Sequence, residues 1–195
     1  MSKFEVYPAT RERWNDLLTL FGPNGAYWNC WCTFWRYTNS EFEAADKESK
    51  IIALKSIVDS DDYIPGLLAY HEGNPIGWMA MSPRSSFRRL VKSRVIKPVD
   101  ELPVWSIVCF FIHKDYRSQG VTRDLILGGI EYAKKNKIPA LEAYPIDNKE
   151  KKVSSESGYV GLVSQFEKAK FVKVADTKSK GGGLPKIIMR YTVSV

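Results

Sequence analysis

The stretch from Phe110 to Ala133 constrains the fold more than any other part of this 195-residue chain. An apolar run, Val104 to Ile112, leads into a short polar segment, and apolar residues then recur from Gly120 at the spacing of one helix face. This pattern predicts a strand, a tight loop and a helix. Gly120 permits a sharp turn, and the first free N–H groups of the helix point out of the loop, as an anion site requires. The alternative is an ordinary strand-to-helix connection capped by Ser118.

Hydrophobic patterns on both sides of this unit predict further strands and helices. Helices are predicted at 14–21, 40–58 and 161–169. Strands are predicted at 4–8, 66–70, 75–81, 140–144, 171–174 and 187–193, with a hairpin turn at 71–74 and a flexible tip at 178–183. The basic segment 82–102 is mostly irregular, which is typical of either a functional lid or a loosely held excursion. This order of elements indicates a mixed α+β fold around one twisted sheet.

The composition fits one domain. With 44% apolar residues, a chain of 195 residues can bury one substantial core, so we expect a single domain over 1–195. No run of eighteen apolar residues occurs, and the N-terminal segment has neither an apolar signal core nor a small-residue cleavage site. We therefore expect a cytoplasmic protein with no membrane partner.

Cysteine spacing and charge distribution each argue against a class of function. Cys30 and Cys32 are separated by one residue, and the third cysteine is Cys109. This spacing gives neither a disulfide framework nor the ligand pattern of a zinc site. We expect reduced thiols and no metal. The net charge of +7 would suit nucleic acid or a phosphate-rich cofactor, but lysine and arginine are scattered along the whole chain. We therefore predict no nucleic-acid partner.

The loop and its flanks resemble a known family motif. The sequence Ile112-His113-Lys114-Asp115-Tyr116-Arg117-Ser118-Gln119-Gly120-Val121 closely resembles the acyl-CoA-binding motif of the GNAT superfamily of N-acetyltransferases. In that motif Gln or Arg is followed by two residues, Gly, one residue, and Gly or Ala. Arg117 and Gly120 match the pattern, Val121 fills the free position, and Thr122 departs from it.

A second segment, 165–171, looks like the family's late helix pattern of Leu, Tyr, any residue, Lys, any residue, Gly and Phe. Lys170 replaces the glycine that normally ends this helix. Phe166 stands where many members carry the tyrosine that protonates the departing thiolate. The resemblance to the family covers most of the chain, from Phe4 to Val193, although only these two segments are specific.

The resemblance implies a GNAT-like fold, with a single twisted, mostly antiparallel sheet flanked by helices and a central strand, loop and helix that bind acetyl-CoA. It also implies that the backbone of Phe110, Phe111 and Ile112 pairs with the pantetheine arm and supplies an N–H to the acetyl oxygen. The residues implied to wrap the pyrophosphate are Arg117, Ser118, Gln119, Gly120, Val121 and Thr122.

Acetyl transfer from a thioester to an amine needs a neutral nucleophile, donors for the oxyanion and a proton for the leaving thiolate. The family often carries a carboxylate on the central strand, but 106–109 contain none. Glu142 is the candidate base because it lies in an otherwise apolar predicted strand beside the cofactor strand, a partly exposed edge residue being the alternative. Phe166 cannot donate a proton, so Tyr159, Ser164 or water is the candidate acid.

The segment 26–37 contains six aromatic residues in twelve and fits neither the helix nor the strand period. One interpretation is core packing. The other is a wall of the acceptor site, because Trp28, Trp31 and Trp35 are spaced three and four apart and could present one aromatic face to an organic cation or flat amine.

We therefore predict an acetyl-CoA-dependent N-acetyltransferase whose partner is a small molecule with a primary amine. The alternative is a non-catalytic acyl-CoA-binding sensor or interaction protein, because Phe166 and the missing central-strand carboxylate remove two expected catalytic groups. The sequence leaves open the identity of the amine, the acyl chain preferred, and the choice between a monomer and a homodimer.

Overall fold

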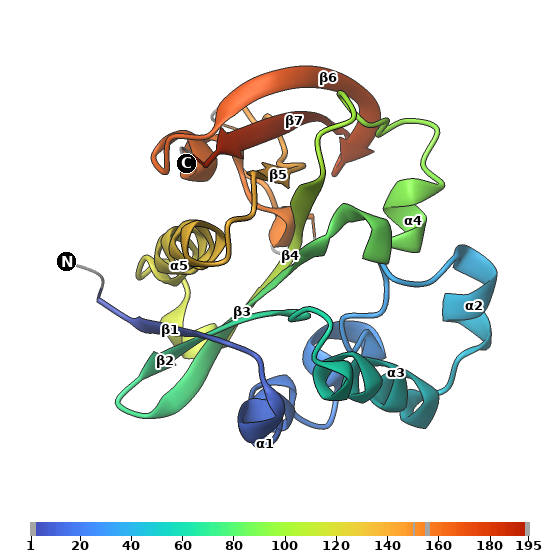
Figure 1. Cartoon of the computed structure of the whole chain (residues 1–195), viewed down its shortest axis with the longest axis vertical. Coiled ribbons are helices and arrows are strands. Elements are labelled where there is room, and N and C mark those ends of the chain that lie inside the picture. The colour runs from blue at the N-terminus through green and yellow to red at the C-terminus, as the bar shows by residue number, and fades with distance from the viewer. Residues whose placement is uncertain (1–2, 150, 155–156, 194–195) are drawn as a thin grey trace.

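One seven-stranded sheet forms the centre of the molecule (Figure 1). The computed structural model describes residues 3–149, 151–154 and 157–193. The strand order is β1-β2-β3-β4-β5-β7-β6, and every neighbouring pair is antiparallel except β4 with β5. The mixed α+β class and the mostly antiparallel sheet are thus confirmed. The strands are β1 (Glu5–Pro8), β2 (Gly66–His71), β3 (Asn74–Pro83), β4 (Val104–Ile112), β5 (Ala140–Ala143), β6 (Val172–Gly181) and β7 (Leu184–Thr192).

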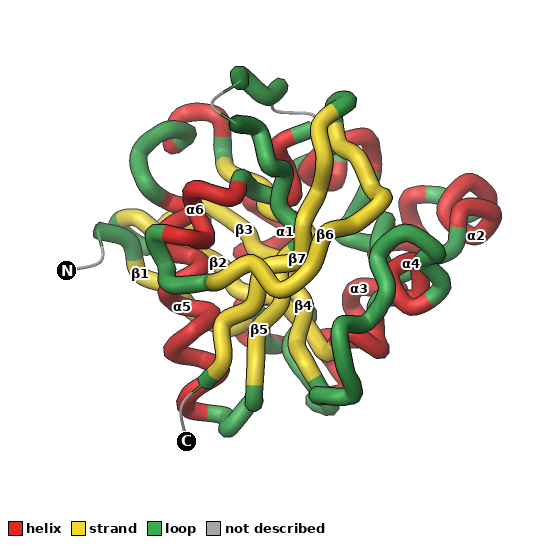
Figure 2. Tube along the Cα trace, turned by 90° about the horizontal axis from the view of Figure 1, so that it is seen from above, coloured by secondary structure: helices red, strands yellow, loops and turns green. Residues whose placement is uncertain are grey.

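Helices cover both faces of the sheet (Figures 1 and 2). On one face α5 (Val121–Lys135) and α6 (Val163–Glu167) bury apolar residues against the strands, and on the other α1 (Trp14–Phe21) and α3 (Lys47–Ser60) do so. Two shorter helices, α2 (Asn39–Ala44) and α4 (Arg88–Val91), lie next to each other and are joined by an ion pair between Glu41 and Arg88. Among the described residues, no helix is long and apolar enough to cross a membrane.

The strands β4 and β5 separate after four residue pairs. Val104 to Ile107 pair with Ala140 to Ala143, while β4 continues to Ile112 without this neighbour. Beyond Ala143 the chain forms bridges from Ile146 to Leu162 and Lys186 instead. The second half of β4 therefore has an edge that β5 leaves open.

A β-bulge marks the place where the two strands diverge. Ala80 of β3 pairs with Cys109 and Met81 pairs with Ile107, so Val108 is an extra residue on β4. A bulge of this kind bends its strand and increases the local twist. The bend turns the end of β4 away from the course of β5.

The single helix predicted at 40–58 is wrong, because the chain forms two helices there. Thr38 and Glu41 make a capping box at the start of α2. Asp46 then caps α3, its carboxylate accepting the backbone N–H of Ser49 at 2.8 Å. Two successive helix-start signals explain why the first helix ends at Ala44.

The bounds predicted for the hairpin tip, 178–183, are also wrong. The strand β6 continues to Gly181, and the turn contains Gly182 and Gly183, whose φ angles of +56° and +78° lie in the left-handed region. Such angles are typical of tight hairpin turns between twisted strands. Both strands of this hairpin are therefore longer than the apolar pattern indicated.

The segment 82–102 is held in place at several points. Phe87, Leu90 and Ile96 are buried in it, and the Nη2 of Arg84 donates to the carbonyl of Ile96 at 3.0 Å. The backbone N–H of Lys178 also donates to the carbonyl of Val95 at 3.3 Å. The segment is an ordered part of the fold between β3 and β4 rather than a loosely held excursion.

Lys170 allows a test of backbone strain. It follows α6 with a φ of +68°, in the left-handed region that favours glycine. Lys170→Gly should raise the free energy of unfolding, measured by urea denaturation, by up to about 1 kcal/mol, since it relieves this strain at some cost in unfolded-chain entropy.

Lys168→Gly is the matched control. Lys168 is also exposed and loses the same charge, but its φ of −61° is helical, so glycine there should destabilise the protein. An equal effect of the two substitutions would contradict the strain argument.

Candidate functional site

The open edge of β4 presents backbone groups to the space that β5 leaves. The N–H of His113 donates to Ile76 of the β3 side at 2.9 Å. Residues of an antiparallel strand alternate between its two edges, so Phe110 and Ile112 direct their N–H and C=O groups to the opposite, open edge. Phe111 faces β3 with its backbone. Of the three residues predicted on this strand, two thus have backbone groups positioned for a ligand lying along β4.

The loop after β4 carries exposed backbone at the start of α5. Ser118 and Gly120 have φ angles of +60° and +93°, and α5 begins at Val121. A Cβ added at Gly120 would meet nothing within 4 Å, so the backbone here borders open space. The Nε of Arg117 donates to the carbonyl of Ile112 at 3.3 Å and ties the loop to the open edge.

The first turn of α5 completes this arrangement. The N–H groups at the start of a helix have no partners within it and create a partial positive charge. Gln119 is exposed in the same loop, while Val121 is buried and Thr122 half-buried. The six loop residues predicted from the sequence therefore form one continuous segment that fits a phosphate group.

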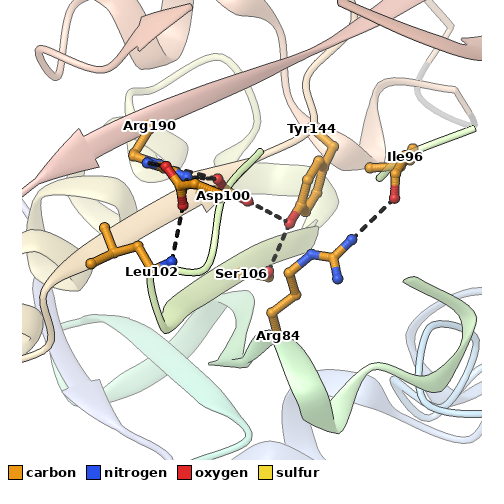
Figure 3. A network of polar contacts seen from close by, with 8 residues as sticks. Arg84, Ile96, Asp100, Leu102, Ser106, Tyr144 and Arg190 are labelled. Atoms are coloured by element: carbon orange, nitrogen blue, oxygen red, sulfur yellow. Dashed lines mark hydrogen bonds and ion pairs between the residues drawn. The ribbon is translucent and has the colours of Figure 1, made fainter. Parts of the chain in front are cut away.

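Glu142 is buried rather than at a partly exposed edge, and it belongs to a polar network with Tyr144 and Arg190, which Figure 3 labels. Its side chain accepts hydrogen bonds from the Nη2 and Nε of Arg190 at 2.7 and 3.1 Å, and from the Oη of Tyr144 at 3.2 Å. The Oγ of Ser106 lies 2.8 Å from the Tyr144 oxygen. The same arginine binds Asp100 of the 82–102 segment at 2.6 and 3.0 Å.

This network connects β4 to a carboxylate and to solvent. Ser106 lies opposite Glu142 in the sheet register and two residues before the bulge. Burial raises the pKa of Tyr144, so its hydroxyl stays protonated and donates to Glu142. A cavity of about 500 Å³ borders Glu142, Arg190 and Asp100. The chain Ser106, Tyr144, Glu142 is therefore able to pass a proton away from β4.

Tyr159 lies on a 3₁₀ turn (Gly158–Val160) against the aromatic segment and near β4. Its ring packs edge-on to Phe34 at 6.5 Å between centroids. Burial is the main cause that raises its pKa, so the phenol remains protonated and can act as a proton donor. Ser164, the other candidate acid, is exposed on α6.

Phe166 fills the core between β4 and β6. It is fully buried, with ring centroids 6.1 Å from Phe110 and 5.2 Å from Phe171. A side chain in this position contributes packing and no proton. This geometry agrees with the sequence argument that another group must serve as the acid.

The three tryptophans of the aromatic segment do not share one face. Trp31 and Trp35 are buried, whereas Trp28 is 82% exposed and stacks on Tyr27 at 5.6 Å. The segment is not a regular helix, because Ala26, Trp28 and Trp31 have positive φ angles. Residues spaced three and four apart therefore point in different directions.

The cysteines are free thiols in the described part of the chain. Burial raises the pKa of each, that of Cys32 to about 11, so all three remain protonated near neutral pH. Cys109 lies on β4 directly after the bulge, and Cys30 and Cys32 come from the aromatic segment. Protonated thiols of this kind are weak nucleophiles.

Sequence reasoning missed four polar side chains of this region: Ser106, Tyr144, Lys186 and Arg190. The signal that singled out Glu142, a charge inside an apolar strand, was also present for Lys186 and Arg190 in β7. Ser106 and Tyr144 carried no such signal, because hydroxyl groups are common at strand ends.

A sequence model of the acetyltransferase (GNAT) family matches residues 26–151 of the chain. The protein belongs to this family. Among curated proteins, none matches the sequence at a significant level.

Solved structures of GNAT proteins share the fold at low identity. One is described as histone acetyltransferase HPA2 and related acetyltransferase from Corynebacterium glutamicum (TM-score 0.62, 15% identity, 100% of this chain and 98% of that one). A second is the PaiA N-acetyltransferase of Thermoplasma acidophilum in complex with coenzyme A (0.52, 17%, 98% and 99%). A third is YncA of Salmonella typhimurium, a putative acetyltransferase with its cofactor acetyl-CoA (0.56, 11%, 99% and 95%). These similarities establish the fold of this GNAT protein.

The ion pair between Asp100 and Arg190 predicts an acid dependence of stability. Hydrogen bonds from Arg190 lower the pKa of Asp100. A lowered carboxyl pKa stabilises the fold above its unfolded value of about 3.9, and this stabilisation is lost as pH falls through the folded value. Between about pH 4.5 and pH 2.5, wild type should lose more stability in urea titrations than Asp100→Asn.

Asp176→Asn serves as the control for this comparison. Asp176 pairs with Lys173 at 2.7 Å, but its side chain is 79% exposed, so the variant should follow wild type closely. If Asp100→Asn loses as much stability with acid as wild type does, the Arg190 interaction is not what ties this segment to the sheet.

Proposed function

We propose that this GNAT protein transfers an acetyl group from acetyl-CoA to the primary amine of a small molecule. The observation that carries the proposal is the continuity between the open edge of β4 and the loop 117–122. An extended ligand with amide groups fits the edge, and a phosphate fits the loop directly beyond it. The pantetheine arm and pyrophosphate of CoA have this order of groups.

The loop residues fit the cofactor they would hold. The open space at Gly120 admits a phosphate close to the backbone, and the N–H groups at the start of α5, which have no partner within the helix, would donate to it. The hydroxyl of Thr122 offers a further donor. Along β4, the N–H of Phe110 is the donor we assign to the acetyl oxygen, where it would stabilise developing negative charge. Bound acetyl-CoA supplies the activated acyl group.

The proton steps are assigned to two groups on the side of the sheet away from α5. Tyr159 is the proposed acid, because its protonated phenol can give its proton to the departing sulfur. Glu142 is the proposed base. Since its carboxylate is bound by Arg190, it acts through the hydroxyl groups of Tyr144 and Ser106 rather than by direct contact with the amine.

One observation favours a second candidate function, a non-catalytic acyl-CoA sensor. The open segment of β4 carries no carboxylate, and Phe166 is a buried core residue. A sensor would keep the edge and the loop but would not consume the thioester. Binding and turnover therefore need separate measurements.

Cofactor binding is tested by thermal shift. A ligand at about a hundred times its Kd stabilises the folded state by about 2.7 kcal/mol, so CoA and acetyl-CoA at millimolar concentration should raise the Tm clearly. Gly120→Asp should abolish the shift, because it places a side chain and a negative charge against the phosphates.

Gly183→Asp is the matched control for this experiment. Gly183 also has a positive φ, +78°, and open space around it, but it lies in the turn between β6 and β7. This variant should bear similar backbone strain and keep the cofactor shift. No shift in wild type at millimolar CoA would reject the cofactor assignment.

Turnover is tested by thioester consumption with a panel of amines. A positioned base contributes about 10² to 10⁴ in rate, so Glu142→Gln should lower kcat/KM at least about tenfold while the CoA thermal shift remains. Tyr144→Phe should cause a similar loss because it interrupts the path to Glu142. Tyr159→Phe should lower kcat when departure of the sulfur limits the rate.

Glu131→Gln controls for loss of a carboxylate elsewhere. Glu131 is 71% exposed on α5 and pairs with Lys134, so its substitution should leave turnover unchanged. An unchanged rate in Glu142→Gln would remove the base assignment. Cofactor binding without turnover on any amine would favour the sensor.

A further inference from the structure

Three cationic side chains surround Phe34 without a carboxylate partner among the described residues. Lys50 lies 4.0 Å from the ring centroid of Phe42, and Arg89 lies 3.9 Å from that of Phe34 itself. Lys186 lies 5.7 Å from the ring of Trp35 and 5.8 Å from that of Tyr159. Phe42, Trp35 and Tyr159 each contact Phe34, so the three cations belong to one aromatic cluster.

Burial makes this excess of positive charge costly. Lys50 and Lys186 are each only 6% exposed. A buried ammonium group normally has an anionic partner, because removal from water penalises its charge. Desolvation indeed lowers the pKa of Lys186, and no carboxylate in the described part of the chain counteracts it. Cation–π contacts recover a part of the lost hydration.

The nearby acidic groups are engaged elsewhere or lie further away. Glu41 pairs with Arg88, and Glu43 acts on Arg89 from beyond ion-pair distance. Asp46 caps α3 through the N–H of Ser49 and likewise acts on Lys50 only from beyond ion-pair distance. Arg89 donates instead to neutral oxygens, the carbonyl of Phe34 at 2.7 Å and the side chain of Asn39. Within the described ranges, the cluster therefore has a net positive charge.

A buried hydrogen-bond donor also has no acceptor in this cluster. The indole Nε1 of Trp35 lacks a partner among the described residues, although the side chain is 8% exposed. Such an orphaned donor is rare in a core. The ammonium nitrogen of Lys186 lies 5.7 Å from the centroid of the same ring.

The cluster lies beside the reactive part of the proposed site. Tyr159, the proposed acid, contacts both Phe34 and Lys186. The thiols of Cys109 on β4 and Cys30 lie close enough to Tyr159 to influence its pKa. Trp35, Phe34, Cys109 and Tyr159 also belong to one hydrophobic cluster on this face of the sheet.

We propose that Lys186, supported by Lys50 and Arg89, receives a carboxylate of the acceptor, so the substrate is a small amine that also carries a carboxylate. This inference rests on the proposed function and narrows its substrate class. The carboxylate would pair with the ammonium group of Lys186, which is the cation of this cluster that lies between Trp35 and Tyr159. The positive field would also favour the neutral form of the acceptor's amine. That effect reduces the demand for a carboxylate base on β4.

The same contacts disfavour an organic cation as acceptor. Faces of the aromatic rings that would bind a cation are already in contact with Lys186, Lys50 and Arg89, and Lys47 lies 5.8 Å from the ring of Trp31. A cationic group brought beside them would meet like charges. The aromatic residues thus hold the protein's own cations.

The test compares matched acceptors in a thioester-consumption assay. Each pair consists of an amino acid and its carboxamide, and several side chains are sampled. Because the amine of the amide has a lower pKa, rates are compared per concentration of neutral amine. Wild type should prefer the acid, with a kcat/KM at least about tenfold higher, because a hydrogen bond to a charged group is lost in the amide. A preference for the amides would overturn the proposal.

Variants at position 186 test whether Lys186 causes the preference for the acid over the amide. Lys186→Met keeps the length of the side chain without its charge and should remove the preference, mainly through KM, whereas Lys186→Arg should retain most of it. Lys178→Met removes an exposed lysine from β6 and should behave as wild type. A preference that survives Lys186→Met would place the carboxylate elsewhere and overturn the assignment.

A binding experiment separates this inference from the proposed function. N-acetylated amino acids and their amides are compared by thermal shift in the presence of CoA. A shift with the acids alone that is lost in Lys186→Met supports the anion site even where no amine is turned over, in which case the transferase proposal fails. Turnover of amines without any such discrimination supports the transferase and rejects the anion site.

Discussion

The divergence of β4 from β5 is the constraint on which the rest of the structure depends. Two parallel strands start as neighbours, and the bulge at Val108 turns β4 away after four residue pairs. The second half of β4 therefore has a row of backbone groups that do not pair with β5. The position of the loop 117–122, directly after the open edge, follows from this bend, and so does the placement of Tyr159 near Cys109.

Charge is distributed unequally on the two sides of this divergence. On the paired half, Arg190 compensates the buried carboxylate of Glu142 and also binds Asp100, so the network is satisfied internally. Around Phe34, by contrast, Lys50, Arg89 and Lys186 lie against aromatic rings and form no ion pair with any residue that the structure describes. The charges around Arg190 stabilise the fold. The cations around Phe34, in our proposal, bind the carboxylate of the acceptor.

The sequence predicted the parts of the fold that local pattern controls. The apolar period and Gly120 placed β4, its loop and α5 correctly, since their residues determine backbone shape directly. The tryptophan spacing failed as a guide, because positive φ angles at Ala26 and Trp28 abolish the helical period it assumed. Glu142 was found as a charge in an apolar strand. Its partner Arg190 is 48 residues away in sequence, so only the sheet register brings the two together.

The open half of β4 has a further consequence as an unpaired strand edge. Exposed edges invite strand addition by other chains, and proteins usually protect them with charge, bulges or covering segments. Here Gly161 and Leu162 bond to Ile146, and Gly161 also packs against the ring of Phe110 on β4. In the proposed complex the pantetheine amides take the place of a missing strand. The cofactor would then act as a structural element of the sheet and guard the protein against aggregation at this edge.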